Sequence, residues 1–163
     1  MKAIKKVKKP KKIKLPKLKK QAWALWSQIV RHIGHCELCG IKYKELTPKG
    51  KPAILNAHHL ISRENFSLSW DVKNGISLCQ MCHKYSKNSP HKNGLIFSNW
   101  YMQKHPENFE YLLENWKGNF DLSIENLQKI IENLEHILNT LESSNLGTTN
   151  HQETSELSTC CPA

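Results

Sequence analysis

The segment "NGISLCQMCH", Asn74–His83, places a turn, an apolar run, a CxxC pair and a histidine within ten residues. A second CxxC pair lies upstream in "CELCG", Cys36–Gly40. Zinc takes four soft ligands in a tetrahedron, and a two-residue spacer lets both sulfurs of one pair face a single ion. Gly40 stands where a knuckle turn often requires a positive φ. The two pairs predict a structural zinc site, with free buried thiols as the alternative. Its ligands would be Cys36, Cys39, Cys79 and Cys82.

Histidines recur at a specific spacing around these cysteines. His58 and His59 are adjacent in "AHHLISR", fourteen residues separate His59 from Asn74, and eight more separate Asn74 from His83. Asn74 by itself would be an ordinary turn residue in "KNG". A simple zinc module needs neither His59 nor His83, so the combination favours catalysis. The alternative is a surface or zinc-binding histidine cluster without catalysis.

Composition bounds the class of protein. The chain has 163 residues and a formal charge of +10, which suggests one domain with appendages. Eleven of the first twenty residues are lysine, and the chain turns acidic beyond Asn119. Such a basic arm commonly contacts nucleic acid by neutralising phosphates and releasing counterions. A solvated tail that aids solubility is the alternative.

The sequence shows no membrane-spanning segment and no secretory signal. No apolar run is long enough to span a bilayer, and lysines and prolines interrupt the basic N-terminus. We therefore expect a reducing compartment, the cytoplasm of a bacterial or phage-infected cell. Paired cysteines in that setting favour metal binding over disulfides.

Hydrophobic periodicity and turn signals divide the chain into five segments. Pro10 and Pro16 should interrupt any helix in the lysine-rich arm. The expected segments are a disordered basic arm at 1–20, a helix at 21–34, a zinc-containing core at 35–94, helices at 95–142 and a disordered tail at 143–163. In that tail, Cys160 and Cys161 have no assigned role.

The segment Ile124–Leu141 carries an apolar stripe at alternating three- and four-residue steps. That spacing is typical of a coiled-coil seam and also of a helix in a bundle. The seam could therefore form a homodimer with a second chain, or equally lie against its own domain.

The histidine and asparagine spacing beside a CxxC pair resembles the HNH endonuclease family over residues 35–94. This family has a ββα-metal fold, in which a two-stranded hairpin and a helix grip a divalent cation. By resemblance, "AHHLISR" is the first strand, "NGISLC" the second and "CHKYSKN" the start of the metal helix. The implied fold is small α+β, with a zinc-stapled core flanked by α-helices. The layout is also similar to small phage HNH proteins, including recombination proteins of the NinG type.

The resemblance also implies site roles. His58 and His83 would bind the catalytic divalent cation, His59 would be the general base, and Asn74 would brace the loop between the strands. The cation would be Mg²⁺ or Mn²⁺, although imidazole ligands suit Mn²⁺, Ni²⁺ or Zn²⁺ better than Mg²⁺. A neutral imidazole can take a proton from water at physiological pH.

Many family members carry a further histidine one turn after the last. Lys87 occupies that position here, and His91 lies beyond Pro90, too far along to be assumed a ligand. We therefore expect a thinner coordination sphere. Arg63, Lys84 and Lys87 flank the site and could hold phosphates, with a solvated basic face as the alternative.

The sequence thus predicts a metal-dependent HNH endonuclease that nicks or cleaves DNA. One alternative is a non-catalytic, zinc-stabilised nucleic-acid-binding module or regulator. Another is a nuclease that acts on branched recombination intermediates.

Overall fold

The computed structural model describes residues 14–145. Most of the expected basic arm, nearly all of the expected tail, and the cysteines at 160 and 161 lie outside the described residues. The helices and strands are α1 (Leu15–Arg31), β1 (Leu55–His59), η1 (Val72–Asn74), β2 (Gly75–Cys79), η2 (Met81–Tyr85), α2 (Gly94–Lys104), α3 (Pro106–Asn115) and α4 (Ile124–Asn145).

The centre of the fold is an antiparallel hairpin followed by a short helix. β1 pairs with β2 so that His58 lies opposite Ile76 and His59 lies opposite Gly75. Successive side chains of a strand point to opposite faces, so His58 and His59 face different sides of the hairpin. The small α+β fold expected from the family resemblance is confirmed.

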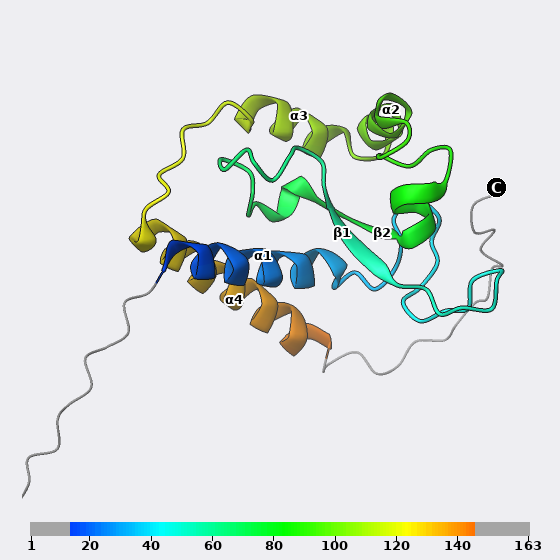
Figure 1. The fold of residues 1–163 in the computed structure, drawn as a ribbon, viewed down its shortest axis with the longest axis horizontal. Helices are drawn as coiled ribbons and strands as arrows, with labels where there is room; N and C mark the ends of the chain where they lie inside the picture. The colour runs from blue at the N-terminus through cyan, green and yellow to red at the C-terminus, as the bar shows by residue number, and fades with distance from the viewer. Residues whose placement is uncertain (1–13, 146–163) are drawn as a thin grey trace, which may run out of the picture.

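Helices cover both faces of this hairpin. Figure 1 shows α1 and α4 side by side on one face, with α2 and α3 on the other. The loop between the strands, residues 60–74, extends beyond the end of the hairpin that carries the two histidines. The hairpin is therefore the middle layer of the molecule, and each of its histidines meets a different helical layer.

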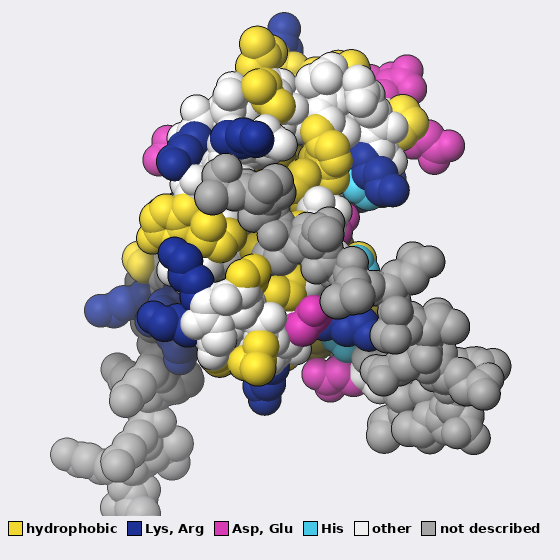
Figure 2. Space-filling view, turned by 90° about the vertical axis from the view of Figure 1, so that its right-hand side faces the viewer, with side chains coloured by type: hydrophobic (Ala, Val, Ile, Leu, Met, Phe, Trp, Pro, Cys, Tyr) yellow, Lys and Arg dark blue, Asp and Glu magenta, His cyan; other side chains and the backbone are white. Residues whose placement is uncertain are grey.

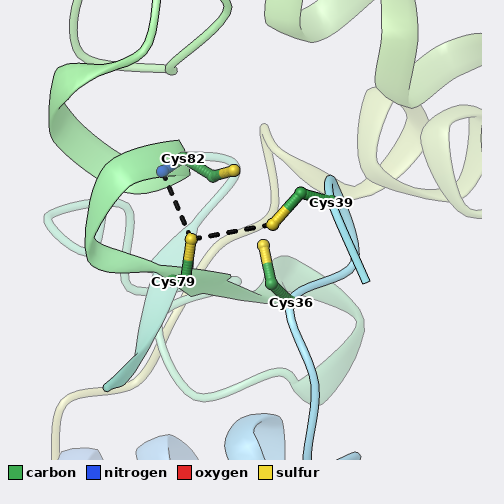
Figure 3. Close-up of side chains that lie close together, drawn as sticks. All are labelled: Cys36, Cys39, Cys79 and Cys82. Atoms are coloured by element: carbon green, nitrogen blue, oxygen red, sulfur yellow. Dashed lines mark hydrogen bonds between the residues drawn. The ribbon is translucent and has the colours of Figure 1, made fainter. Parts of the chain in front are cut away.

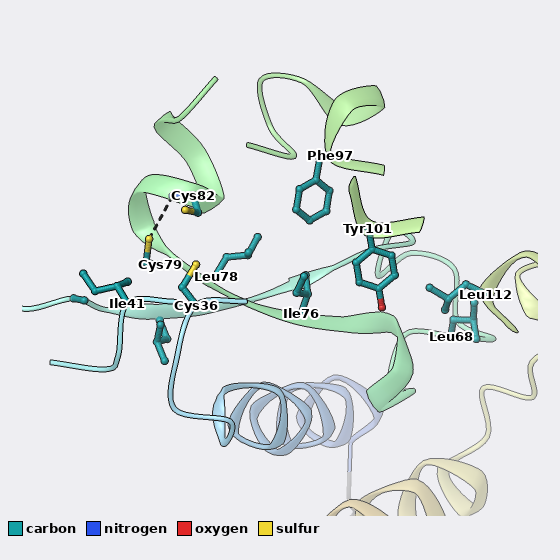
Figure 4. Close-up of a cluster of buried hydrophobic side chains, with 12 residues drawn as sticks. Cys36, Ile41, Leu68, Ile76, Leu78, Cys79, Cys82, Phe97, Tyr101 and Leu112 are labelled. Atoms are coloured by element: carbon teal, nitrogen blue, oxygen red, sulfur yellow. Dashed lines mark hydrogen bonds between the residues drawn. The ribbon is translucent and has the colours of Figure 1, made fainter. Parts of the chain in front are cut away.

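The core between the hairpin and α2–α3 includes Cys36, Cys79 and Cys82, which lie at one side of it (Figure 4). Ile76 and Leu78 of β2 are fully buried there, and Phe97 and Tyr101 of α2 cover them. Each buried side chain of this size stabilises the folded state by about 1.5–3 kcal/mol relative to leaving it exposed. The cysteine-bearing segments and α2 thus share one core.

A second core fills the space between α1, α4 and the inter-strand loop. Ala22 and Trp26 of α1 pack there with Trp70 of the loop and with Leu127 and Leu134 of α4. The apolar stripe of α4 therefore packs against its own chain, which is one of the two alternatives that its periodicity left open. Homodimerisation through this stripe is not shown.

The first helix starts earlier than the sequence predicted. α1 begins at Leu15, so residues 15–20 are helical instead of belonging to a disordered arm. Pro16 lies in the first turn, where its missing N–H breaks no helical hydrogen bond and its fixed φ suits the helix. The apolar stripe that contacts α4 also begins inside this stretch, because Leu15 and Leu18 already pack in the second core.

The boundaries of the two strands and of the helix after them also differ from those that the family resemblance implied. β1 ends at His59, because the chain then turns into a loop that bonds to Asn74. η2 is one wide turn, closed by the bond from Ser86 N to Met81 O at 2.8 Å. No helix within residues 14–145 combines the length and the apolar character that a membrane crossing requires.

Candidate metal centres and active site

Four cysteines from two distant segments converge at one end of the hairpin. Cys36 and Cys39 come from the loop after α1, Cys79 ends β2, and Cys82 lies in η2 (Figure 3). Gly40 has a φ of 78°, as the knuckle turn predicted, and its N–H donates to Cys36 O at 2.7 Å. This turn brings both sulfurs of the first pair to the second pair.

The cysteine cluster fits zinc. The four Sγ atoms lie within 4.8 Å of one another, and Sγ of Cys39 is 3.8 Å from Sγ of Cys79. Sulfurs bound to one zinc at about 2.3 Å in a tetrahedron would be about 3.8 Å apart. Contact with the Cys39 thiol lowers the pKa of Cys36 to about 7, and contact with Cys36 lowers that of Cys79. The thiolate forms of Cys36 and Cys79 are thereby favoured, whereas contact with Cys36 raises the pKa of the Cys39 thiol.

A second cluster consists of three imidazoles. Nδ1 of His58 lies 3.2 Å from Nε2 of His83, and Nε2 of His91 lies 3.1 Å from that same atom. One ligand atom from each ring lies within 4.8 Å of the other two. His58 and His83 are half-buried and His91 is exposed, so the cluster opens to solvent on the His91 side.

His91 lies beside the two expected ligands, although the sequence placed it too far along to be assumed one. The chain leaves η2 at Ser86 and then folds through consecutive turns, with Ser89 N donating to Ser86 O and Asn93 N donating to Ser89 O. Ser89 is fully buried and anchors this reversal. His91 thus reaches His83 through a compact turn, although helical spacing alone would not bring it there.

The imidazole cluster fits a divalent cation. Burial, followed by the neighbouring rings of His83 and His91, lowers the pKa of His58 to about 3. Burial also lowers the pKa of His83. Both rings are therefore neutral at physiological pH and keep a lone pair for a metal. Nitrogens in adjacent positions at about 2.1 Å from one ion would be roughly 3.0–3.4 Å apart, which agrees with the observed separations.

His59 lies on the other face of β1, apart from this cluster. Its Nε2 is 3.0 Å from the carbonyl oxygen of Ser69, and its ring stacks on Trp26 with centroids 3.7 Å apart. A carbonyl only accepts hydrogen bonds, so Nε2 carries the proton and Nδ1 keeps the lone pair. Burial lowers the pKa of His59, while the bond to Ser69 partly opposes this. A neutral ring with a free Nδ1 is suited to accept a proton.

Asn74 is fully buried beneath the loop between the strands. Its Oδ1 accepts from Ile61 N at 2.7 Å, while its Nδ2 donates to Ile61 O at 2.9 Å and to Leu68 O at 3.0 Å. These bonds tie both sides of the loop to the start of β2. The loop carries Ser69, so Asn74 also supports the carbonyl that holds His59.

The three expected phosphate-contacting residues are all exposed but do not form one group. Lys84 belongs to η2 and Lys87 follows it in the turn toward the histidine cluster. The Arg63 guanidinium lies 5.2 Å from the ring centroid of Trp23, on the α1 side. The two lysines are therefore near His83, and Arg63 is near His59.

One protein-family model matches the segment that holds the clustered cysteines and most of the candidate site histidines. The HNH endonuclease family model matches residues 36–89, about a third of the chain. The matched residues include all four cysteines and His58, His59, Asn74 and His83. Over residues 36–89 the chain is therefore similar to an HNH endonuclease domain. Comparisons with curated proteins and with solved structures gave no match, and the likeness to NinG-type proteins is not shown.

Sequence reasoning missed two contributors to the site. His91 lies two residues past the matched segment, and Trp26 lies ten residues before it. The position of His91 close to His83 in the sequence was a signal that could have identified it as a candidate ligand. The sequence carried no comparable signal for Trp26, because a buried tryptophan on an apolar helix face is an ordinary packing residue.

Proposed function

We propose that this protein is a metal-dependent HNH endonuclease that hydrolyses DNA phosphodiester bonds. The proposal rests on one observation: His58 and His59 are adjacent in β1, but their side chains lie on opposite faces and have different neighbours. His58 faces His83 and His91, whereas His59 faces Trp26 and keeps Nδ1 free. A cation site and a base on opposite faces of one strand end can approach one phosphate from two sides.

His59 would act as the general base. The Ser69 carbonyl fixes the Nε2–H tautomer, so Nδ1 can take the proton of the attacking water. Because burial lowers its pKa, the ring stays neutral at physiological pH and needs no prior deprotonation. Proton transfer of this kind typically contributes about 10²–10⁴-fold to the rate.

His58, His83 and His91 would hold the catalytic cation. A bound divalent cation supplies charge neutralisation at the scissile phosphate and stabilises the departing oxygen. Three imidazoles on one side leave the solvent side of the cluster open for the phosphate. The proposed cation is Mg²⁺ or Mn²⁺, while the imidazole-only ligand set favours Mn²⁺, Ni²⁺ or Zn²⁺ over Mg²⁺.

DNA affinity would come mainly from electrostatics. Figure 2 shows Lys and Arg side chains spread over one face among apolar and some acidic ones, without gathering into a single patch. The densest positive charge in the sequence is the lysine-rich segment before residue 21. We therefore propose that this segment supplies salt-sensitive, largely sequence-independent affinity, and that Arg63, Lys84 and Lys87 contact phosphates near the cleaved bond.

Cleavage of supercoiled plasmid tests the proposal. Purified protein is incubated with plasmid in Mg²⁺, Mn²⁺, Ni²⁺ or EDTA, beside His59→Ala. We expect nicked or linear product with at least one cation, none in EDTA, and a rate at least about 10²-fold lower for His59→Ala. Plasmid that is bound but left intact with every metal would instead support the non-catalytic nucleic-acid-binding module. A branched DNA substrate included in the same assay would reveal a preference for recombination intermediates.

A further inference from the structure

The helix α1 contacts the proposed general base directly. Trp26 stacks on His59 with ring centroids 3.7 Å apart and an interplanar angle of 13°. Trp26 is 2% exposed and belongs to the second core, whereas His59 is half-buried, so the stack joins the base to that core. α1 ends at Arg31, before the segment that matches the HNH family begins. The contact is therefore made by a part of the chain outside that match.

α1 also holds the carbonyl that fixes the His59 tautomer. Trp23 Nε1 donates to Ser69 Oγ at 2.8 Å, and Trp26 Nε1 donates to Asp71 O at 2.8 Å. Ser69 Oγ in turn donates to Arg63 O, and Ser69 O accepts from His59 Nε2. Two tryptophans of one helix thus fix the loop at Ser69 and at Asp71, and Trp26 also stacks on the imidazole.

A glycine permits this close approach. Gly75 is the partner of His59 in the hairpin register. A Cβ at Gly75 would lie 2.3 Å from Cγ2 of Val30 and 2.9 Å from Cζ2 of Trp26, both on α1. These distances are shorter than any tolerated carbon contact, so the side chains of Val30 and Trp26, or α1 itself, would have to shift. The absence of a side chain at Gly75 therefore lets α1 lie against the hairpin at the level of His59.

We infer that Trp26 is a positioning residue for the general base, and that α1 is part of the catalytic unit. The inference rests on the proposed function. Stacking limits rotation of the His59 ring, and the Ser69 carbonyl selects one tautomer, so Nδ1 is presented in one direction. Misplacing a reacting group by about 1 Å can lower a rate about 10²-fold, so loss of this support should affect turnover more than binding.

The test compares tryptophan variants of the full chain. Trp26→Leu removes the stack, Trp26→Phe keeps an aromatic ring without the Nε1 donor, and Trp116→Leu is a matched control at an exposed tryptophan of the α3 end. We expect Trp26→Leu to lower kcat about 10–100-fold. KM and bound metal should stay within about 2-fold. Trp26→Phe should recover part of the rate, and Trp116→Leu should match wild type.

A spectroscopic readout separates positioning from general loss of structure. Nitrogen-15 NMR of the imidazoles should show His59 as a single Nε2–H tautomer in wild type and as a tautomer mixture in Trp26→Leu. Gly75→Ala provides a second variant in case Trp26→Leu fails to fold, because its added Cβ pushes against Val30 and Trp26 while both rings are kept. We expect Gly75→Ala to lower kcat, and Gly75→Ala with Val30→Ala to recover part of it, since Val30→Ala removes the nearest methyl groups.

The outcomes distinguish this inference from the proposed function. Wild-type protein that cleaves no DNA overturns both. Wild-type cleavage with an unchanged kcat and an unchanged His59 tautomer in Trp26→Leu and Gly75→Ala overturns the inference alone. The inference also fails where Trp26→Leu loses DNA binding, metal and kcat in parallel while His59 keeps its tautomer, because that pattern marks a purely structural role.

Discussion

The cysteine cluster and the histidine cluster are neighbours along the chain but differ in burial and in completeness. Cys36 and Cys82 are fully buried, and the four sulfurs lie within 4.8 Å of one another, which supplies a complete ligand set for zinc. The three imidazoles are half-buried to exposed and leave one side open. A closed four-ligand site suits a structural ion, whereas an open site can admit a phosphate. Cys82 and His83 are adjacent in η2, so one helical turn serves both clusters.

This comparison predicts the largest effect for loss of a cysteine ligand. Cys79→Ser should abolish zinc binding and unfold the hairpin region, because binding of a structural zinc contributes on the order of 10 kcal/mol to folding. Elemental analysis and circular dichroism would measure zinc content and folding. Cys160→Ser is the matched control and should keep one zinc. A folded Cys79→Ser protein with full zinc content would contradict the structural role.

Substituting the two adjacent histidines should separate metal binding from proton transfer. His58→Ala should lose the second cation and all cleavage, because it removes a ligand. His59→Ala should keep both ions, with kcat lower by about 10²–10⁴-fold. Metal titration by calorimetry, together with plasmid cleavage, measures both quantities. If His59→Ala also released the cation, the division between the two faces of β1 would be wrong.

Removal of the buried amide should weaken the loop without affecting zinc. Asn74→Ala leaves Ile61 N and two carbonyls without their partner, which should lower the free energy of unfolding by about 1–3 kcal/mol. Urea unfolding of the zinc-bound protein measures the change. Asn65→Ala, at an exposed bond to Trp116 O, serves as the control with a smaller expected loss. An equal decrease in the free energy of unfolding in both variants would show that Asn74 stabilises the loop no more than an exposed hydrogen bond does.

Loss of the exposed His91 should weaken binding of the catalytic cation. His91→Ala removes one of three ligands, so we expect the cation Kd to rise about 10-fold or more while zinc content stays at one per chain. His136→Ala on the exposed face of α4 is the matched control. Isothermal titration with Mn²⁺ gives the Kd values. Identical Kd values for wild type and His91→Ala would remove His91 from the site.

The smallest effects should come from the surface lysines. Lys84→Ala and Lys87→Ala should each weaken DNA binding only modestly, and each should reduce the slope of log Kd against log salt by about 1. Fluorescence anisotropy at several salt concentrations measures the slope. Lys129→Ala on α4 serves as the control. A slope unchanged by both substitutions would place the phosphate contacts elsewhere.

The sequence predicted those parts of the site that depend on spacing. The CxxC pairs fix sulfur geometry locally, and the spacing of His59, Asn74 and His83 indicated the hairpin and its following turn. His91 was missed because the turns around Ser89 bring it back, and such turns leave no periodic signal. The start of α1 was misplaced because Pro16 was interpreted as a helix breaker, although the first turn tolerates proline.

The packing partners of the helices could not be read from their apolar stripes. The stripe from Ile124 to Leu141 is the same whether α4 meets α1 or a second chain, because both require the same spacing. The stack of Trp26 on His59 depends equally on tertiary approach, permitted by Gly75. Composition and periodicity describe a single element, whereas these contacts arise from the way two elements meet.

Selective removal of one metal tests the central claim most directly, that the chain has a structural site and a separate catalytic site. The protein is dialysed against EDTA until elemental analysis shows one zinc per chain, and plasmid cleavage is then followed as Mn²⁺ or Mg²⁺ is added. We expect no cleavage after dialysis, full recovery with about one added cation per chain, and no recovery in His58→Ala. Cleavage that persists with only the zinc of the cysteine cluster, or that recovers in His58→Ala, would contradict the assignment.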